Sequence, residues 1–277
     1  MKILKIYRLI STIIILNLAS MLASIAYAAN PTITETTISS ANDLLVVTFS
    51  ENVFNTNGGS GDLETSDFDL SVANGVANVG AATPTYIVKV SQSSYLLGFS
   101  TTGIANGSET ITVVPASGAS IYNAAAEAAS ETQSNNTASF NEKVVPTISS
   151  VSINAANSTL TVTFSENVYD TTSGSGDLEV GDFTLSVAGG VAEIGAATPT
   201  SIIRTSQKVW VLGFSTSGIA TGSETITVVP ASSASIYDGA SNAASATQSN
   251  NTASFNEKVV PTISSVSLSA ANTALTV

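Results

Sequence analysis

The chain has 277 residues, and its 20 Asp and Glu against 8 Lys and Arg give a formal net charge of −12. It contains neither cysteine nor histidine, which excludes disulfides, thiolate or imidazole catalysis and the usual zinc and haem ligands. The acidic balance argues against nucleic acid as a partner, because phosphate binding needs a basic surface.

The first 28 residues have the pattern of a secretory signal peptide. Three basic residues within the first eight positions precede an apolar run at 9–22, and Ala26 and Ala28 place small side chains where a signal peptidase reads them. A membrane anchor is the alternative, but the run is short for a span and contains Asn17. We predict cleavage after Ala28, which makes the mature chain secreted, either extracellular or on the cell surface, without a membrane span.

A long internal repeat organises the remainder. Pro31-Thr-Ile recurs at Pro146 and at Pro261, each 115 residues after the previous copy, and about 80 of the 115 positions are identical between the first two copies. A period of this length indicates whole domains in tandem. We therefore predict repeat 1 at 29–145, repeat 2 at 146–260 and the truncated start of a third repeat at 261–277.

The third copy stops after 17 residues, in the middle of a predicted strand. We expect that the chain is a fragment of a longer array, the alternative being a natural end that leaves two strands unpaired. Residues 261–277 should then be disordered, or should dock on repeat 2 as an added strand.

Within each copy the apolar residues alternate with polar ones. Leu160, Val162 and Phe164 share one face of a predicted strand at 160–165, with threonine and serine on the other face. The same period marks three further segments of repeat 2, at 182–187, 209–214 and 224–229. Glycine and proline turns separate these segments, so we predict about seven antiparallel strands in each copy and an all-β sandwich fold.

Two aromatic residues at equivalent positions, Tyr95 and Trp210, share the period of the predicted core residues of their strands, so we predict that both point inward.

The segments that join successive copies are very short, at 141–146 and 256–261. Proline restricts the backbone there and biases the preceding valine toward an extended conformation. We expect consecutive sandwiches to form a semi-rigid rod.

Three blocks of sequence carry a resemblance to a known family. Pro146-Thr-Ile opens a strand, Leu160-Thr-Val-Thr-Phe-Ser-Glu-Asn-Val168 is an alternating strand that ends in Phe-Ser-Glu, and Ile236-Tyr-Asp-Gly-Ala-Ser-Asn242 is similar to an Asp-x-x-Gly-Asn turn. The copies thereby resemble the bacterial immunoglobulin-like repeats of large secreted and surface proteins. Ser241 stands where that turn usually has glycine, and the first copy lacks both the Asp and the Asn.

The resemblance implies tandem immunoglobulin-like antiparallel β-sandwiches outside the cytoplasm, in a stalk or adhesin, with neighbouring repeats of the same array as partners. Such sandwiches serve many roles, so the resemblance is more specific for the fold than for the function.

The loop after Phe-Ser-Glu is the most acidic local feature of each copy. Oxygen ligands on flexible loops suit Ca²⁺, which takes 6–8 of them. The alternative is a solvated loop whose aspartates cap turns through backbone amides. The candidate Ca²⁺ ligands are Glu51, Asp62 and Asp67 in repeat 1 and Glu166, Asp177 and Asp182 in repeat 2.

Two other kinds of site can be weighed against this one. Glu51 with Asp62, or Glu166 with Asp177, could form the carboxylate pair of a glycosidase, but an exposed sandwich loop offers no cleft to raise one pKa, and we expect no enzyme. A glycan platform would need exposed aromatic rings, and the available ones are scattered: Tyr86, Tyr122, Tyr169 and Tyr237.

The sequence therefore favours a non-catalytic structural or adhesive stalk segment of a multi-repeat protein. The alternatives are a glycan- or Ca²⁺-dependent module that binds a surface glycan or another cell-surface protein, and an accessory domain of an exported polysaccharide-degrading enzyme.

Overall fold

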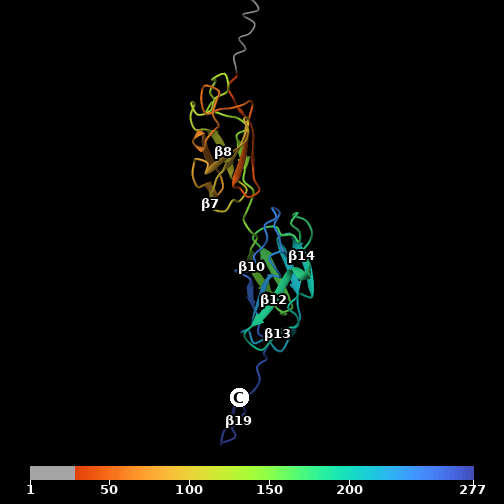
Figure 1. Ribbon diagram of the computed structural model, residues 1–277. Helices are drawn as coiled ribbons and strands as arrows, with labels where there is room; N and C mark the ends of the chain where they lie inside the picture. The colour runs from red at the N-terminus through yellow and green to blue at the C-terminus, as the bar shows by residue number, and fades with distance from the viewer. Residues whose placement is uncertain (1–28) are drawn as a thin grey trace, which may run out of the picture. The chain divides into compact units, whose positions relative to one another are not determined.

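The computed structural model describes residues 29–277. The predicted signal peptide, residues 1–28, lies outside the described residues. The chain divides into two compact units, Met1–Glu142 and Lys143–Val277, and each is described by itself (Figure 1).

The described part of the first unit is built from short strands that follow the predicted alternation of apolar and polar residues. They are β1 (Ile33–Ile38), β2 (Leu44–Phe49), β3 (Phe68–Ala73), β4 (Asn78–Val79), β5 (Tyr86–Ser91), β6 (Ser94–Gly98), β7 (Thr101–Thr102), β8 (Thr110–Pro115) and β9 (Thr137–Ser139).

The second unit repeats this order 115 positions later. Its strands are β10 (Ile148–Ile153), β11 (Thr159–Phe164), β12 (Phe183–Ala188), β13 (Glu193–Ile194), β14 (Ser201–Ser206), β15 (Val209–Gly213), β16 (Thr216–Ser217), β17 (Thr225–Pro230) and β18 (Thr252–Ser254). The four strand segments predicted from the sequence of this copy lie within one residue of β11, β12, β15 and β17.

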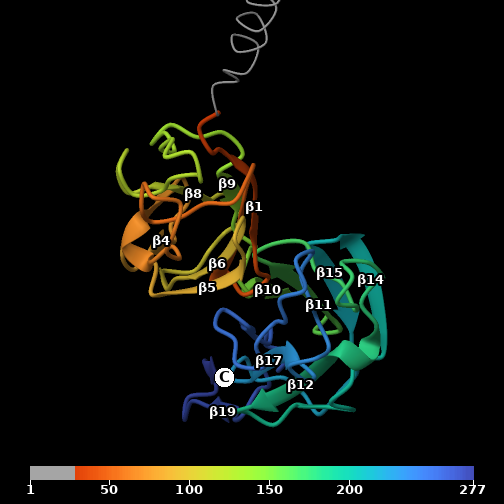
Figure 2. The same cartoon turned by 45° about the horizontal axis from the view of Figure 1, so that its top comes forward.

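Each unit pairs its seven longer strands into two antiparallel sheets. In the first unit the orders are β1-β2-β6-β5 and β3-β8-β9, and in the second they are β10-β11-β15-β14 and β12-β17-β18. If the seven longer strands are given the letters A to G in chain order, the two sheets have the orders A-B-E-D and C-F-G. This is the arrangement of a constant-type immunoglobulin sandwich. Figure 2 shows β11, β15 and β14 side by side, with β12 and β17 in the other layer. The prediction of an all-β sandwich is confirmed.

The inner faces of the two sheets meet in a single apolar core in each unit. Phe49 of β2 and Phe68 of β3 bring the sheets of the first unit together with ring centroids 6.3 Å apart, and Phe164 and Phe183 do the same in the second unit at 6.3 Å. Tyr95 and Trp210 are fully buried, so the prediction that they point inward is confirmed. Because the strands supply alternate residues to this core, the outer faces carry threonine and serine, together with exposed apolar residues such as Val46, Val88 and Ile203.

Helical structure in residues 29–277 is limited to two three-residue 3₁₀ turns, η1 (Thr65–Asp67) and η2 (Val180–Asp182). The alanine-rich stretches at 124–130 and 239–245 are irregular turns rather than helices. No helix in the described part of the chain is long and apolar enough to cross a membrane.

Residues 261–277 contain a small hairpin of their own, β19 (Ser267–Leu268) with β20 (Leu275–Thr276). The expectation that they extend a sheet of repeat 2 is wrong, because β19 and β20 pair only with each other. The expectation of disorder stays a prediction. The turn between β19 and β20 closes locally, because the Asn272 N–H donates to the Ser269 carbonyl at 2.9 Å and Asn272 adopts a positive φ of 54°. Asn157 closes the β10–β11 turn in the same way, with φ 54°.

Candidate functional site

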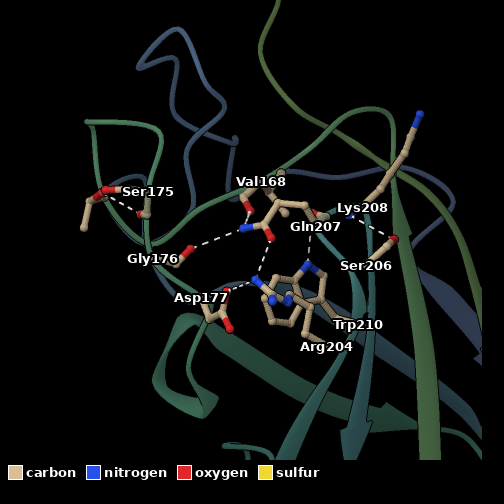
Figure 3. Close-up of polar contacts among 10 residues, drawn as sticks. Val168, Ser175, Gly176, Asp177, Arg204, Ser206, Gln207, Lys208 and Trp210 are labelled. Atoms are coloured by element: carbon tan, nitrogen blue, oxygen red, sulfur yellow. Dashed lines mark hydrogen bonds and ion pairs between the residues drawn. The ribbon is translucent and has the colours of Figure 1, made fainter.

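The acidic loop of repeat 2 leaves β11 at the edge of the core and returns at β12. Its tip is attached to the β14–β15 hairpin through Gln207, which lies in the turn of that hairpin. The Gln207 side-chain amide donates to the carbonyls of Val168 at 3.1 Å and of Gly176 at 3.3 Å. Figure 3 shows this amide between the two loop carbonyls.

Charged side chains complete the same attachment. Arg204 Nη1 donates to Gln207 Oε1 at 3.0 Å and forms an ion pair with Asp177. The two side chains of that pair are 47% and 56% exposed, so water screens it and its contribution to stability is below about 1 kcal/mol. Trp210 Nε1 donates to the Gln207 carbonyl at 3.3 Å, which ties the hairpin turn to the core.

We call this attachment of the acidic loop to the hairpin turn, through Gln207, Arg204 and Asp177, the bracket. Repeat 1 builds the bracket with a different cation and a different aromatic residue. Lys89 Nζ contacts Asp62 at 2.6 Å and Gln92 Oε1 at 3.0 Å, and Gln92 Nε2 donates to the Val53 carbonyl at 2.7 Å. Tyr95 replaces the tryptophan, and its hydroxyl lies 3.4 Å from the same carbonyl. In both repeats a cation therefore contacts the glutamine, and the glutamine donates to a loop carbonyl. These contacts are kept although lysine replaces arginine and tyrosine replaces tryptophan in repeat 1.

Asp67 and Asp182 cap the 3₁₀ turns that end the acidic loops. Asp67 Oδ2 accepts from the Glu64 N–H at 2.7 Å, and Asp182 Oδ2 accepts from the Glu179 N–H at 2.7 Å. Burial raises the pKa of both carboxyls, and the backbone hydrogen bond opposes that shift. The negative charge of Asp170 raises the pKa of Asp182 further; the equivalent residue in repeat 1 is the neutral Asn55.

Glu51 and Glu166, the remaining candidates, lie beside the turn that resembles the family motif. Asn123 Nδ2 donates to Glu51 Oε1 at 3.3 Å. In repeat 2 the asparagine is replaced by Asp238, and carboxylate oxygens of Glu166 and Asp238 lie within 4.8 Å of each other. The structure thus places Glu51 and Glu166 at this turn, Asp62 and Asp177 at the bracket, and Asp67 and Asp182 at the caps.

Within residues 29–277, no three carboxylates of the same repeat bring their oxygens close enough together to share one ion. Four of the six candidates instead have partners of their own repeat in the bracket and the caps. The calcium interpretation stays a prediction.

The motif turn, residues 238–242 in repeat 2 and 123–127 in repeat 1, keeps its geometry in both copies. Asp238 Oδ1 accepts from the N–H groups of Ala240 and Asn242, both at 2.8 Å. Asn123 Oδ1 accepts from Ala125 at 3.0 Å and Glu127 at 2.9 Å. Either side chain offers the one oxygen that the turn needs.

The same turn explains the glycine of the family pattern. Ser241 has a φ of 73° and Ala126, its equivalent in repeat 1, a φ of 69°, a region that residues with a Cβ rarely adopt. Both copies therefore accept backbone strain at a position where glycine would have none.

Sequence reasoning missed the best-bonded carboxylates of the molecule, Glu109 and Glu224. Both are fully buried at the start of β8 and β17. Glu109 accepts from the backbone N–H groups of Val76, Ala77, Asn106 and Gly107 at 2.9–3.2 Å. Glu224 accepts from the corresponding groups of repeat 2: Val191, Ala192, Thr221 and Gly222.

The protonation of these two glutamates follows from their surroundings. Burial alone would raise the pKa, but the converging backbone N–H groups outweigh it and lower the pKa of each to about 2. The charge therefore stays on the carboxylate, where it joins two loops of the same repeat. A signal was present in the sequence, since Glu224 alternates with Ile226 and Val228 on the inward face.

The tyrosines considered for a glycan platform are exposed or half-buried in the structure. Tyr86 is 48% exposed on the outer face of β5 and lies over Gly98 of β6, where a side chain would collide with its ring. Tyr122 is half-buried and pairs through its backbone with Phe54, and Tyr169 and Tyr237 are half-buried and pair with each other. Tyr169 and Tyr237 therefore lie on neighbouring segments of repeat 2, whereas in repeat 1 the residue equivalent to Tyr169 is Phe54.

A hollow of about 510 Å³ lies beside β12 in the second unit. It is lined mainly by residues 185–190 and by the segment from Ala192 to Ala197, and Glu193 is the one titratable residue among them.

Comparison with known proteins gives distant structural similarities. No protein-family model matches the sequence, and no curated protein is significantly similar to it. The N-terminal part of the bacterial S-layer protein SbsC aligns at 16% identity and a TM-score of 0.31, over 73% of this chain and 40% of that one. The BSP domain of a biofilm-associated protein aligns at 10% identity and a TM-score of 0.20, over 84% of this chain and 30% of that one.

Proposed function

We propose that this chain is a non-catalytic structural segment of a secreted or cell-surface protein, in which successive sandwiches act as spacers. The observation that carries the proposal is the use of the polar side chains. Four pairs of equivalent side chains bond to backbone groups of their own repeat: Gln92 and Gln207, Asp67 and Asp182, Glu109 and Glu224, and Asn123 and Asp238. Asp62 and Asp177 pair instead with the side chains of Lys89 and Arg204 in the same repeat.

A further contact supports a mechanical role. Asn157 lies in the first hairpin turn of repeat 2, and Asn256 lies at the end of its last strand. Asn157 Nδ2 donates to the Asn256 carbonyl at 2.7 Å, and the Asn256 N–H donates back to Asn157 Oδ1 at 2.9 Å. Asn42 and Asn141 make the same exchange in repeat 1, at 2.7 and 2.8 Å. Each repeat thereby fastens the end of its chain to its first hairpin.

Export is part of the proposal and depends on the pattern of residues 1–28. The absence of histidine and cysteine, together with the internal bonding of the acidic residues, supports a role without catalysis. Neighbouring repeats of the same chain are the partners that this function requires. Binding to a surface glycan or to another cell-surface protein would be an addition to the spacer role.

Single-molecule pulling on residues 29–277 between two handles tests the mechanical proposal. We expect two separate unfolding events, each releasing roughly 400 Å of chain at ~3.6 Å per residue, less the folded length of one repeat. Chain extension without discrete events would contradict a spacer function. Export has its own test, since N-terminal sequencing of the secreted product should begin at Ala29.

A further inference from the structure

Three Asn-Gly dipeptides occur in repeat 1, at Asn57, Asn74 and Asn106, and repeat 2 has none of them. The equivalent positions carry Thr172, Gly189 and Thr221. Asn-Gly is the dipeptide most open to spontaneous deamidation, because glycine leaves its backbone nitrogen unobstructed beside the asparagine side chain. The reaction needs that nitrogen to lose its proton and reach the side-chain carbonyl carbon.

At Asn106 both reacting groups are occupied. The Gly107 N–H donates to Glu109 Oε2 at 3.0 Å. The Asn106 side-chain oxygen accepts from the Ser108 N–H at 3.0 Å and from the Ser108 hydroxyl at 2.6 Å. The buried glutamate therefore holds the attacking nitrogen in its protonated form and away from the asparagine side chain.

At Asn74 the same glutamate acts through the turn. Asn74 and Gly75 have φ values of 64° and 60°, and the next two N–H groups, of Val76 and Ala77, donate to Glu109. A Cβ on Gly75 would lie 2.3 Å from that carboxyl group, so a negative charge stands against the glycine backbone. Loss of a proton from the Gly75 nitrogen is disfavoured, and the turn cannot rearrange freely.

Asn57 and Gly58 have neither restraint. Both are exposed in the acidic loop, and the space around Gly58 is open, with Thr56 Oγ1 at 3.9 Å as the nearest atom to a built Cβ. Within the described structure, no hydrogen bond engages the Asn57 side chain or the Gly58 N–H. The turn is closed by a long bond, from the Gly59 N–H to the Thr56 carbonyl at 3.3 Å.

We propose that Asn57 is a site of spontaneous deamidation in the folded protein. The Gly58 nitrogen bonds to Asn57 Cγ as the bond from Cγ to the amide nitrogen breaks, and ammonia leaves with the proton that Gly58 lost. Water then opens the resulting succinimide at either carbonyl, which yields aspartate or isoaspartate at position 57. The acidic loop of repeat 1 gains one negative charge, and the isoaspartate product lengthens the backbone by one methylene.

The test is peptide mapping of folded residues 29–277 after incubation at mildly alkaline pH, with isoaspartate detected by enzymatic methyl transfer. We expect a mass gain of about 1 Da in the peptide that contains position 57, well before the peptides that contain Asn74 and Asn106. Asn57→Thr, which copies the repeat 2 residue, should abolish the gain. Gly58→Ala, at a position with room for a methyl group, should slow it.

The matched control is the same protein unfolded in urea, where all three dipeptides should deamidate at similar rates. Deamidation of position 106 as fast as position 57 in the folded protein would overturn the proposal. So would a folded protein whose position 57 remains unmodified while the unfolded control reacts.

Discussion

Glu109 Oε1 accepts a hydrogen bond from the Ala77 N–H at 3.0 Å, which joins the start of β8 to a turn 32 residues earlier in the chain. Glu224 and Ala192 form the same contact at 3.1 Å. Within residues 29–277, no cation is among the hydrogen-bond partners of either carboxylate. A full negative charge is therefore kept inside each sandwich by backbone dipoles, which is favourable only while the two loops hold their folded positions.

The first prediction concerns acid. In the folded repeats Glu109 and Glu224 have a pKa of about 2, below the ordinary value of 4.5. The unfolded chain therefore binds more protons between these values, and the stabilisation is complete above about pH 4.5 and lost as the pH falls toward 2. Urea unfolding followed by Trp210 fluorescence from pH 7 to 2.5 should show this loss in repeat 2.

The variant Glu224→Gln checks the cause. Its amide group would place an N–H donor against backbone N–H donors, so repeat 2 should be less stable at pH 7 and less sensitive to acid. Because Trp210 is the only tryptophan of the chain, Glu109→Gln should leave this signal unchanged and serves as the matched control. An unaltered acid dependence in Glu224→Gln would show that the buried glutamate is not its source.

The second prediction concerns the asparagine exchange at the end of repeat 2. Asn157 has a φ of 54°, so Asn157→Gly keeps the backbone conformation and removes only the side-chain bonds to Asn256. We expect a loss of roughly 1–3 kcal/mol in the free energy of unfolding, and a lower unfolding force for repeat 2 in pulling experiments. Asn42→Gly should act on repeat 1 instead. Equal stability of Asn157→Gly and the parent would refute the role given to this contact.

The third prediction separates the parts of the bracket. Gln207→Ala leaves two loop carbonyls without their donor and should cost about 1–2 kcal/mol. Arg204→Ala removes a screened ion pair and should cost less than about 1 kcal/mol. Denaturation monitored by Trp210 measures both, and Gln92→Ala is the repeat 1 counterpart. A larger loss for Arg204→Ala would mean that charge, not the glutamine amide, secures the loop.

The fourth prediction concerns calcium. If the acidic loops bind Ca²⁺, millimolar Ca²⁺ should raise the thermal midpoint above the value in EDTA, and Asp177→Asn should reduce the difference. If the aspartates serve only the ion pairs and caps, the two midpoints should coincide. Differential scanning calorimetry distinguishes the outcomes, with NaCl at matched ionic strength as the control for screening.

Much of the fold could be predicted because the alternation of apolar and polar residues is regular. Leu160, Val162 and Phe164 could be assigned to one face from their spacing alone, and Tyr95 and Trp210 to the core. The order of the strands in the sheets could not, because it depends on pairings between segments far apart in the chain, such as β2 with β6.

The candidate site was harder to predict for a physical reason. Asp62 and Asp177 are acidic residues on an exposed loop, a pattern that serves metal ligands and ion pairs equally, and the pairing depends on Lys89 and Arg204, each 27 positions away. The importance of Glu109 could not be seen from residue type either, since its partners are backbone groups. Its inward position in the alternating pattern was the one available signal.

The most direct test of the central claim is the unfolding of residues 146–260 expressed alone. If each repeat is bonded within itself, this segment should unfold in a single cooperative transition, at a urea midpoint close to that reported by Trp210 in residues 29–277. A broad, non-cooperative transition, or a segment that is unfolded without urea, would contradict the account.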